Sequence, residues 1–133
     1  MKNVTDKFSF ILKPSTVQNG GVGVFALHDI AKDTYMELFL KDFQEEMQEK
    51  TEIPEELRGY CLHQENGKLL CQKFFNRMDI GNYLNHSSDA NLKWENGKGY
   101  FAKRDIKAGE EIFSNYVELG EPEEEMEDYY KIK

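Results

Sequence analysis

The sequence predicts a single, mostly β domain, and three observations support this prediction. Asn-Gly pairs lie at residues 19–20, 66–67 and 96–97, each near runs of apolar or aromatic residues. Because Asn and Gly tolerate the positive φ that tight hairpin turns require, the pairs predict three hairpins. The length of 133 residues suits one domain, and no linker rich in Gly, Pro or Ser divides the chain. We therefore expect short strands without a second domain.

The acidic segment 42–58 is the clearest helical candidate. Its apolar residues follow a loose helical spacing, namely Phe43, Met47, Ile53 and Leu57. Pro54 interrupts this stripe, because proline does not continue a regular helix. We expect a small helical insert between strands.

A weak internal repeat links two distant segments. Residues 25–30 (FALHDI) and 101–106 (FAKRDI) share an aromatic residue, Ala, a basic residue, Asp and Ile at equivalent positions. Each is followed by a polar turn and another strand-like run, YMELF or EEIFSNY. The pattern predicts two strand-turn-strand units, which need not share an origin.

The charge balance limits the class of partner. The chain has 25 Asp and Glu against 17 Lys and Arg, a net charge of -8. This balance disfavours direct binding to nucleic acid and is compatible with a basic protein or peptide as partner. Residues 117–133 alone contain seven acidic residues and two lysines.

Neither a membrane span nor a secretion signal is predicted. No apolar run approaches the roughly 18 to 20 residues of a span, and the N-terminus lacks the apolar core of a signal peptide. We expect a cytoplasmic protein without a membrane partner. Cys61 and Cys71 are then ordinary, partly buried thiols rather than a disulfide.

Three polar or Gly-rich segments carry the chemical signal. They are GGVGVFA at 20–26, NHSSDAN at 85–91 and GEEIFSNY at 109–116. In this order the segments resemble the SET-domain protein lysine methyltransferases. That family has a Gly-x-Gly turn before an apolar strand, an Asn-His-Ser-Cys-x-Pro-Asn loop, and Gly-Glu-Glu leading to Tyr. The likeness spans residues 20–116, and we place the SET domain at 8–117.

The resemblance implies a fold and a reaction. The fold is a β-clip-like set of short sheets with a C-terminal pseudoknot, into which the loop 85–91 is threaded. Ser87 and Asn91 fasten this loop internally, and its polar side chains replace absent ladder bonds. The reaction is transfer of methyl from S-adenosylmethionine to lysine side chains of a basic protein or peptide, histone-like or other. The donor occupies one cleft and the lysine enters from the opposite face. The alternative is a SET-like module that binds basic peptides with little turnover.

The resemblance also assigns donor contacts to Gly21, Val22, Gly23, Asn85, His86 and Tyr116. Asn85 reaches the amino-carboxyl end of the donor, the His86 backbone holds the adenine, and Gly23 leaves room for close approach. Tyr116 is the catalytic candidate, because its hydroxyl points at the junction of donor and lysine and orients the amine. Without the resemblance, residues 21–23 read as a plain turn, His86 as a structural histidine, and Tyr116 as the end of a strand.

Two residues are candidates for the substrate channel. Ser114 stands where many family members carry Phe or Tyr, and Tyr83 lines either the channel or the core. Ser88 and Ala90 replace the usual Cys and Pro of the polar loop. The cysteine clusters that form zinc-binding flanks in many members are missing, so no metal site is expected.

The acidic tail 118–133 is a candidate lid over the lysine channel. Tyr129 and Tyr130 could supply an aromatic wall while the acidic run attracts a basic substrate. The alternative is a solubilising tail. Pairing of two copies to complete a substrate groove, and action in a cell or host nucleus, also stay open.

Overall fold

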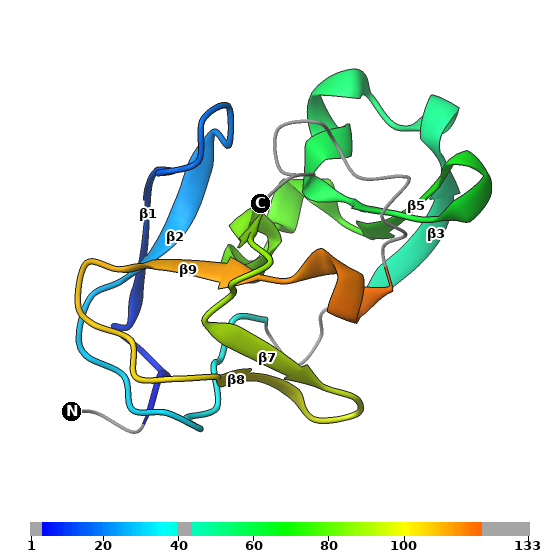
Figure 1. Cartoon of the computed structure of the whole chain (residues 1–133). Coiled ribbons are helices and arrows are strands. Elements are labelled where there is room, and N and C mark those ends of the chain that lie inside the picture. The colour runs from blue at the N-terminus through cyan, green and yellow to red at the C-terminus, as the bar shows by residue number, and fades with distance from the viewer. Residues whose placement is uncertain (1–3, 40–43, 121–133) are drawn as a thin grey trace.

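The computed structural model describes residues 4–39 and 44–120, which form short strands joined by turns and 3₁₀ segments (Figure 1). The strands are β1 (Phe10–Pro14), β2 (Val22–Ala26), β3 (Glu45–Glu49), β4 (Leu62–His63), β5 (Lys68–Gln72), β6 (Asn85–His86), β7 (Leu92–Glu95), β8 (Gly99–Ala102) and β9 (Glu111–Ser114). The 3₁₀ segments are η1 (Lys50–Glu52), η2 (Glu55–Tyr60), η3 (Glu65–Gly67), η4 (Phe75–Arg77), η5 (Ile80–Tyr83) and η6 (Tyr116–Leu119). This confirms the mostly β expectation. No helix of the described residues is long and apolar enough to cross a membrane.

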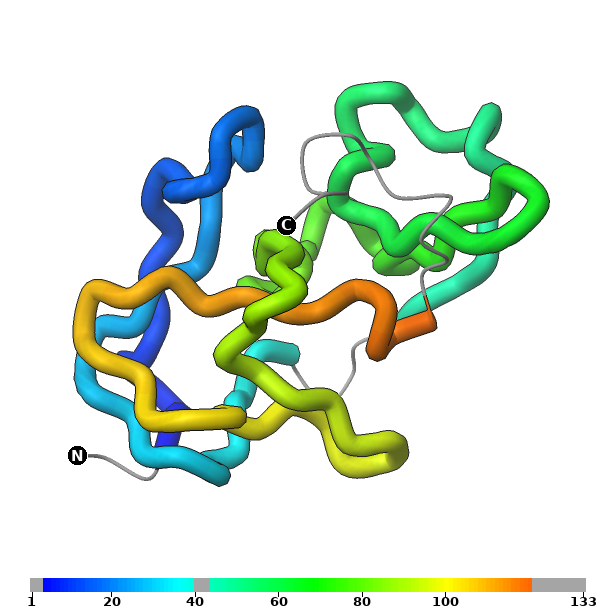
Figure 2. Tube along the Cα trace, viewed as in Figure 1, coloured from blue at the N-terminus to red at the C-terminus, as the bar shows by residue number. Residues whose placement is uncertain are grey.

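The strands form three small sheets. Their orders are β1-β2-β9-β6, β3-β5-β4 and β7-β8. The expected hairpins are confirmed as β1–β2, β4–β5 and β7–β8. Asn19 and Asn66 both have φ of 64°, and Gly97 has φ of 78°. The chain trace in Figure 2 shows β9 crossing between the β1–β2 hairpin and the β3–β5 sheet. The end of β9 therefore lies between the β1–β2 hairpin and the β3–β5 sheet.

The helical expectation for residues 42–58 is wrong over most of its length. Residues 44–72 form an insert that begins with β3, which pairs with β5 through contacts such as Met47 opposite Leu70. Within residues 44–58 only η1 and η2 are helical, and both are short 3₁₀ segments on either side of Pro54. Residues 42 and 43 lie outside the described ranges. Pairing with β5 overrides a weak local helical spacing, as is common for short amphipathic segments.

The two repeated segments pair with each other around a local pseudo-two-fold axis. Ile30 and Ile106 exchange backbone hydrogen bonds of 2.7 and 2.9 Å. Asp29 and Asp105 each accept a backbone amide from the turn that follows the other segment, both at 2.9 Å. The predicted strand-turn-strand unit is present in the second segment, as β8 and β9. In the first segment the run after the turn forms no strand and makes only an isolated bridge, from Tyr35 to Phe101. Each segment completes the hydrogen bonding of the other.

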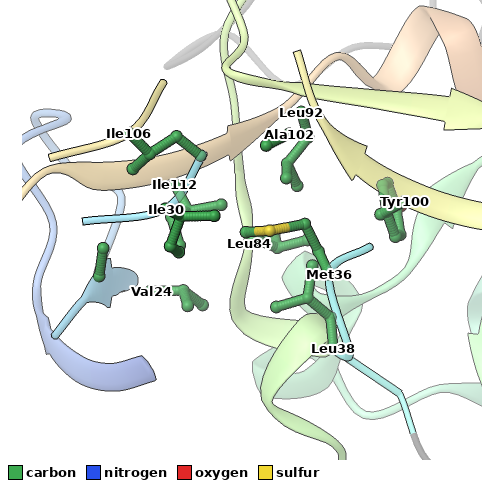
Figure 3. Packing of buried hydrophobic residues seen from close by; sticks show 11 residues of the cluster. Val24, Ile30, Met36, Leu38, Leu84, Leu92, Tyr100, Ala102, Ile106 and Ile112 are labelled. Atoms are coloured by element: carbon green, nitrogen blue, oxygen red, sulfur yellow. The ribbon is translucent and has the colours of Figure 1, made fainter. Parts of the chain in front are cut away.

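The main core lies where these segments meet the polar loop (Figure 3). It contains Val24, Ala26, Ile30, Met36, Leu38, Leu84, Leu92, Tyr100, Ala102, Ile106 and Ile112, all 7% exposed or less. Figure 3 shows the Met36 side chain directed toward Leu84. A smaller core under the insert includes the buried thiols of Cys61 and Cys71, which form no disulfide. Leu84 belongs to the main core and directly precedes β6, so the core fixes where the polar loop begins.

The polar loop is fastened to the last strand mainly by side chains. β6 runs parallel to β9 over only two residue pairs. Beyond them, Asn91 donates from Nδ2 to the Glu111 carbonyl at 2.8 Å and accepts from the Phe113 amide at 2.8 Å. Ser87 accepts the Asp89 amide at 3.1 Å. Ser87 therefore fastens the loop internally, as expected, whereas Asn91 takes the place of missing ladder bonds to β9.

Candidate functional site

Two cavities meet at the C-terminal end of β9. One, of about 490 Å³, is lined by aromatic rings and is called here the aromatic cavity. The other, of about 520 Å³, is lined mainly by polar groups and is called the polar cavity. Five residues border both, namely Gly59, Tyr60, Asn82, Leu84 and Tyr116. The shared wall contains Tyr116, the residue that the sequence singles out as catalytic.

The aromatic cavity combines six rings with carboxylates. The rings belong to Tyr35, Phe39, Tyr60, Trp94, Tyr100 and Tyr116. Glu45 and Glu118 also border it, and no Lys or Arg is found among its described lining residues. Burial raises the pKa of Glu45. Such a lining favours a long side chain with an apolar stem and a positive end.

Tyr100 and Ser114 lie together in the aromatic cavity. Burial is the main cause that raises the pKa of Tyr100 to about 12, although its hydrogen bond with Ser114 acts in the opposite direction. The phenol therefore stays protonated at neutral pH. Ser114 lines this cavity, as its assignment to the substrate channel requires.

The polar cavity brings together three segments of the chain. Residues 19–21 of the β1–β2 loop and Val22 at the start of β2 form one side, and Tyr83 to Asn85 form another. The third side comes from the insert, through Lys50, Glu55, Glu56 and Arg58. Cationic, anionic and amide groups thus face one space. Gly21, Val22, Asn85 and Tyr116, four of the predicted donor contacts, lie on its wall.

Tyr116 is held at both its backbone and its hydroxyl. Its amide donates to His86 Nδ1 at 2.9 Å, and the two rings lie 5.1 Å apart. Its hydroxyl donates to the Leu84 carbonyl at 2.5 Å. Because Leu84 and Tyr116 both border the two cavities, this phenol is fixed where the cavities join.

His86 acts as a neutral structural acceptor. Its side chain is 2% exposed, and burial lowers its pKa. Because Nδ1 accepts the Tyr116 amide, it carries no proton in this arrangement. The ring therefore orients Tyr116, and no proton transfer is assigned to it.

Acidification is expected to destabilise the fold through His86. The unfolded chain, with the ordinary pKa of 6.5, binds this proton more readily than the folded chain. The stabilising contribution is complete above that value and is lost as the pH falls from it through the lower folded-state pKa. We expect the melting temperature of the wild type to drop more steeply between pH 7 and 5 than that of His86→Asn. Thermal melts followed by circular dichroism measure both slopes, and parallel slopes would contradict the assignment.

Gly23 lies in β2 beside the Glu111 carboxylate. It is absent from the described wall of the polar cavity. A Cβ at this position would meet the Glu111 carboxylate, and Asn85 Nδ2 would be 3.4 Å away. The missing side chain therefore makes room for Glu111, and the donor contact assigned to Gly23 stays a prediction.

Tyr83 packs against the main core, one of the two positions expected for it. It borders the polar cavity and packs edge-on against Tyr60, with ring centroids 5.4 Å apart. Ser114 borders the aromatic cavity, so the two predicted channel residues lie on different sides of the shared wall.

Tyr129 and Tyr130 of the predicted lid lie outside the described ranges. Within those ranges no group of three or more His, Cys, Asp or Glu residues is arranged to hold a metal ion.

Two residues of the site were missed in the sequence. Tyr100 occupies a strand position that reads as ordinary core, and nothing local marks it. Glu111 stands beside Glu110 in GEEI, where both read as solvated acids. The signal available for Glu111 was strand alternation, which places adjacent residues on opposite faces and so buries one of the pair.

Comparison with known proteins agrees with this geometry. The family model of the SET domain matches residues 21–117. No curated protein sequence matches the chain. Among solved structures, polycomb repressive complex 2 of Chaetomium thermophilum is 25% identical with a TM-score of 0.55, over 81% of this chain and 15% of that one.

Two further structures share the fold. The Chaetomium complex bound to S-adenosylmethionine is 23% identical with a TM-score of 0.51, over 84% of this chain and 15% of that one. The methyltransferase domain of human PR domain-containing protein 2 is 19% identical with a TM-score of 0.51, over 81% of this chain and 76% of that one. The chain thus spans about 15% of the length of the polycomb chains that it matches.

Proposed function

Since this chain belongs to the SET-domain family, we propose that it is a protein lysine methyltransferase that uses S-adenosylmethionine and acts on a basic protein or peptide. The observation that carries the proposal is the shared wall of the two cavities at Tyr116. Methyl transfer between a sulfonium and an amine needs the two reactants to meet in line from opposite sides. Two cavities that join at one fixed phenol provide that arrangement, and restricted geometry supplies much of the rate.

The polar cavity fits the donor by the chemistry of its groups. Lys50 and Arg58 suit the carboxylate of an amino acid, and Glu55 and Glu56 suit its ammonium group. Asn85 adds a side-chain amide on the opposite wall. When bound, the donor supplies a methyl group on a positively charged sulfur, so the chain needs no metal or covalent nucleophile for this reaction.

The aromatic cavity fits the lysine. Glu45 and Glu118 attract the ammonium group, and the rings accept its apolar stem. The two carboxylates favour the ammonium form, whereas desolvation between the rings and the positive charge of a bound donor lower the pKa of the lysine from its ordinary value of roughly 10.4 toward the neutral form that attacks. Tyr100 is protonated at neutral pH and does not act as a base. We therefore assign the loss of the ammonium proton to solvent during entry, and the orientation of the amine to Tyr116.

The proposal is tested by methyl transfer. The protein is incubated with labelled S-adenosylmethionine and a panel of basic proteins and peptides, and mass spectrometry identifies the modified residue. We expect label on lysine. Donor and peptide binding without transfer would instead support the binding module, and failure to bind the donor would reject both.

Asn85→Ala is expected to weaken donor binding about 10- to 30-fold, because one or two hydrogen bonds in the polar cavity are lost. Asn85 is 5% exposed and its Nδ2 donates to the Val22 carbonyl at 3.0 Å, so the change also loosens that wall. Titration calorimetry with S-adenosylhomocysteine measures the affinity. Asn96→Ala, in an exposed hairpin turn, is the matched control. Equal affinity in both variants would remove Asn85 from the donor site.

A further inference from the structure

Glu111 connects two walls of the polar cavity from outside it. Its Oε1 accepts the Thr16 amide at 2.7 Å and the Thr16 hydroxyl at 2.6 Å. Its Oε2 accepts the Ser15 hydroxyl at 2.7 Å and Asn85 Nδ2 at 3.4 Å. These four residues are called here the Glu111 network. The carboxylate is 5% exposed and joins segments up to 96 residues apart in the chain.

The network sets the position of the β1–β2 loop. The Ser15 amide donates to the Gly21 carbonyl at 2.8 Å, which closes the loop on itself. The same loop and the start of β2 contribute residues 19–22 to the polar cavity. Fixing Ser15 and Thr16 therefore fixes that side of the cavity.

The network also orients Asn85 on the facing wall. Its Nδ2 is shared between the Val22 carbonyl at 3.0 Å and Glu111 at 3.4 Å. The amide nitrogen of Asn85 donates to Val22 and to Glu111, so the carbonyl oxygen of the same side chain points away from these two residues. The Glu111 carboxylate thus fixes the position of the β1–β2 loop relative to Asn85 on the facing wall.

We propose that Glu111 is a positioning residue for the methyl donor, acting through the β1–β2 loop and Asn85 without touching the donor. This inference rests on the proposed function, because it concerns the affinity of the same cavity. Its four donors are two hydroxyls, one backbone amide and one side-chain amide. Bonds from such donors to a carboxylate are stronger than those to a neutral amide.

The test is Glu111→Gln, which keeps the shape of the side chain and removes its charge. We expect the dissociation constants of S-adenosylmethionine and S-adenosylhomocysteine to rise about tenfold, the equivalent of one charge-assisted hydrogen bond. With the donor saturating, kcat should change less than about threefold and the KM of the peptide should stay unchanged, because the aromatic cavity is not altered. A loss of kcat at saturating donor, with unchanged KM for the donor, would overturn the inference.

Asp29→Asn is the matched control. Asp29 is also a carboxylate that accepts a backbone amide, at 2.9 Å from Ala108, but it lies at the pseudo-two-fold pairing instead of the cavity. We expect it to lower the melting temperature without changing donor affinity. If both variants lose donor affinity equally, Glu111 has only a structural role.

A second pair of measurements keeps the inference testable if Glu111→Gln folds poorly. The double variant Ser15→Ala, Thr16→Val removes the hydroxyl donors from the loop side and should also weaken donor binding. Combining it with Glu111→Gln should add little, because both act through one network. In addition, hydrogen exchange of the Thr16 amide should be faster in Glu111→Gln without any ligand. Wild-type protein that fails to bind the donor would reject the proposed function, whereas this exchange rate would still test the network.

Discussion

Tyr116→Phe is expected to bind the donor as the wild type does and to lose most of its turnover. The hydroxyl donates to the Leu84 carbonyl at the wall that both cavities share. Its removal leaves the ring and the backbone bond to His86 in place. Loss of one fixed polar group at a reacting centre costs about 10²- to 10³-fold in kcat. Single-turnover transfer of labelled methyl measures the rate, and calorimetry measures the donor affinity.

Tyr100→Phe is the matched control for this result. It removes a phenol from the aromatic cavity but not from the shared wall, and Tyr100 bonds to Ser114 rather than to Leu84. We expect this variant to keep turnover within about tenfold of the wild type, because the loss of one ordinary hydrogen bond changes a rate by no more than about that factor. If Tyr116→Phe turns over at the parental rate, the phenol does not orient the amine. If both variants lose activity equally, the site depends on polarity of the cavity and not on the position of Tyr116.

Local turn chemistry was readable from the sequence. Asn19 and Asn66 adopt φ of 64°, a conformation that few other residues accept without strain, so the pairs identified real hairpins. The three motif segments also predicted the wall of the polar cavity, through Gly21, Val22 and Asn85. The turns and this grouping of residues are features that a short stretch of chain determines by itself or by its family pattern, and the donor contacts themselves stay a prediction.

Long-range partners were not readable. The spacing of residues 42–58 favoured a helix, yet β3 gains a full antiparallel ladder with β5, which no local pattern reveals. Glu110 and Glu111 are chemically identical neighbours, but only Glu111 is buried and bonded to Thr16. The packing of Glu111 against Gly23 was hidden for the same reason, since the two residues lie far apart along the chain.

Gly23→Ala is expected to lower both the free energy of unfolding and the affinity for the donor. An added Cβ would meet the Glu111 carboxylate and would lie 2.9 Å from its Cδ. Gly23 lies in β2, between the strand partners β1 and β9, so its backbone has little freedom to move away. The carboxylate must shift and lose bonds to Ser15, Thr16 or Asn85, and we expect a cost of about 2–4 kcal/mol from overpacking together with the lost hydrogen bonds.

Urea unfolding measures that cost, and Gly59→Ala is its control, since a Cβ at Gly59 meets nothing within 4 Å. A double-mutant cycle then identifies the cause. If the carboxylate is what the new methyl group displaces, Glu111→Ala opens the space, and Gly23→Ala should cost much less in that background than alone. Equal costs in the two backgrounds would mean that the methyl group collides with the strand backbone. The tight packing at Gly23 would then be independent of Glu111, and the donor affinity of Gly23→Ala should stay near that of the wild type.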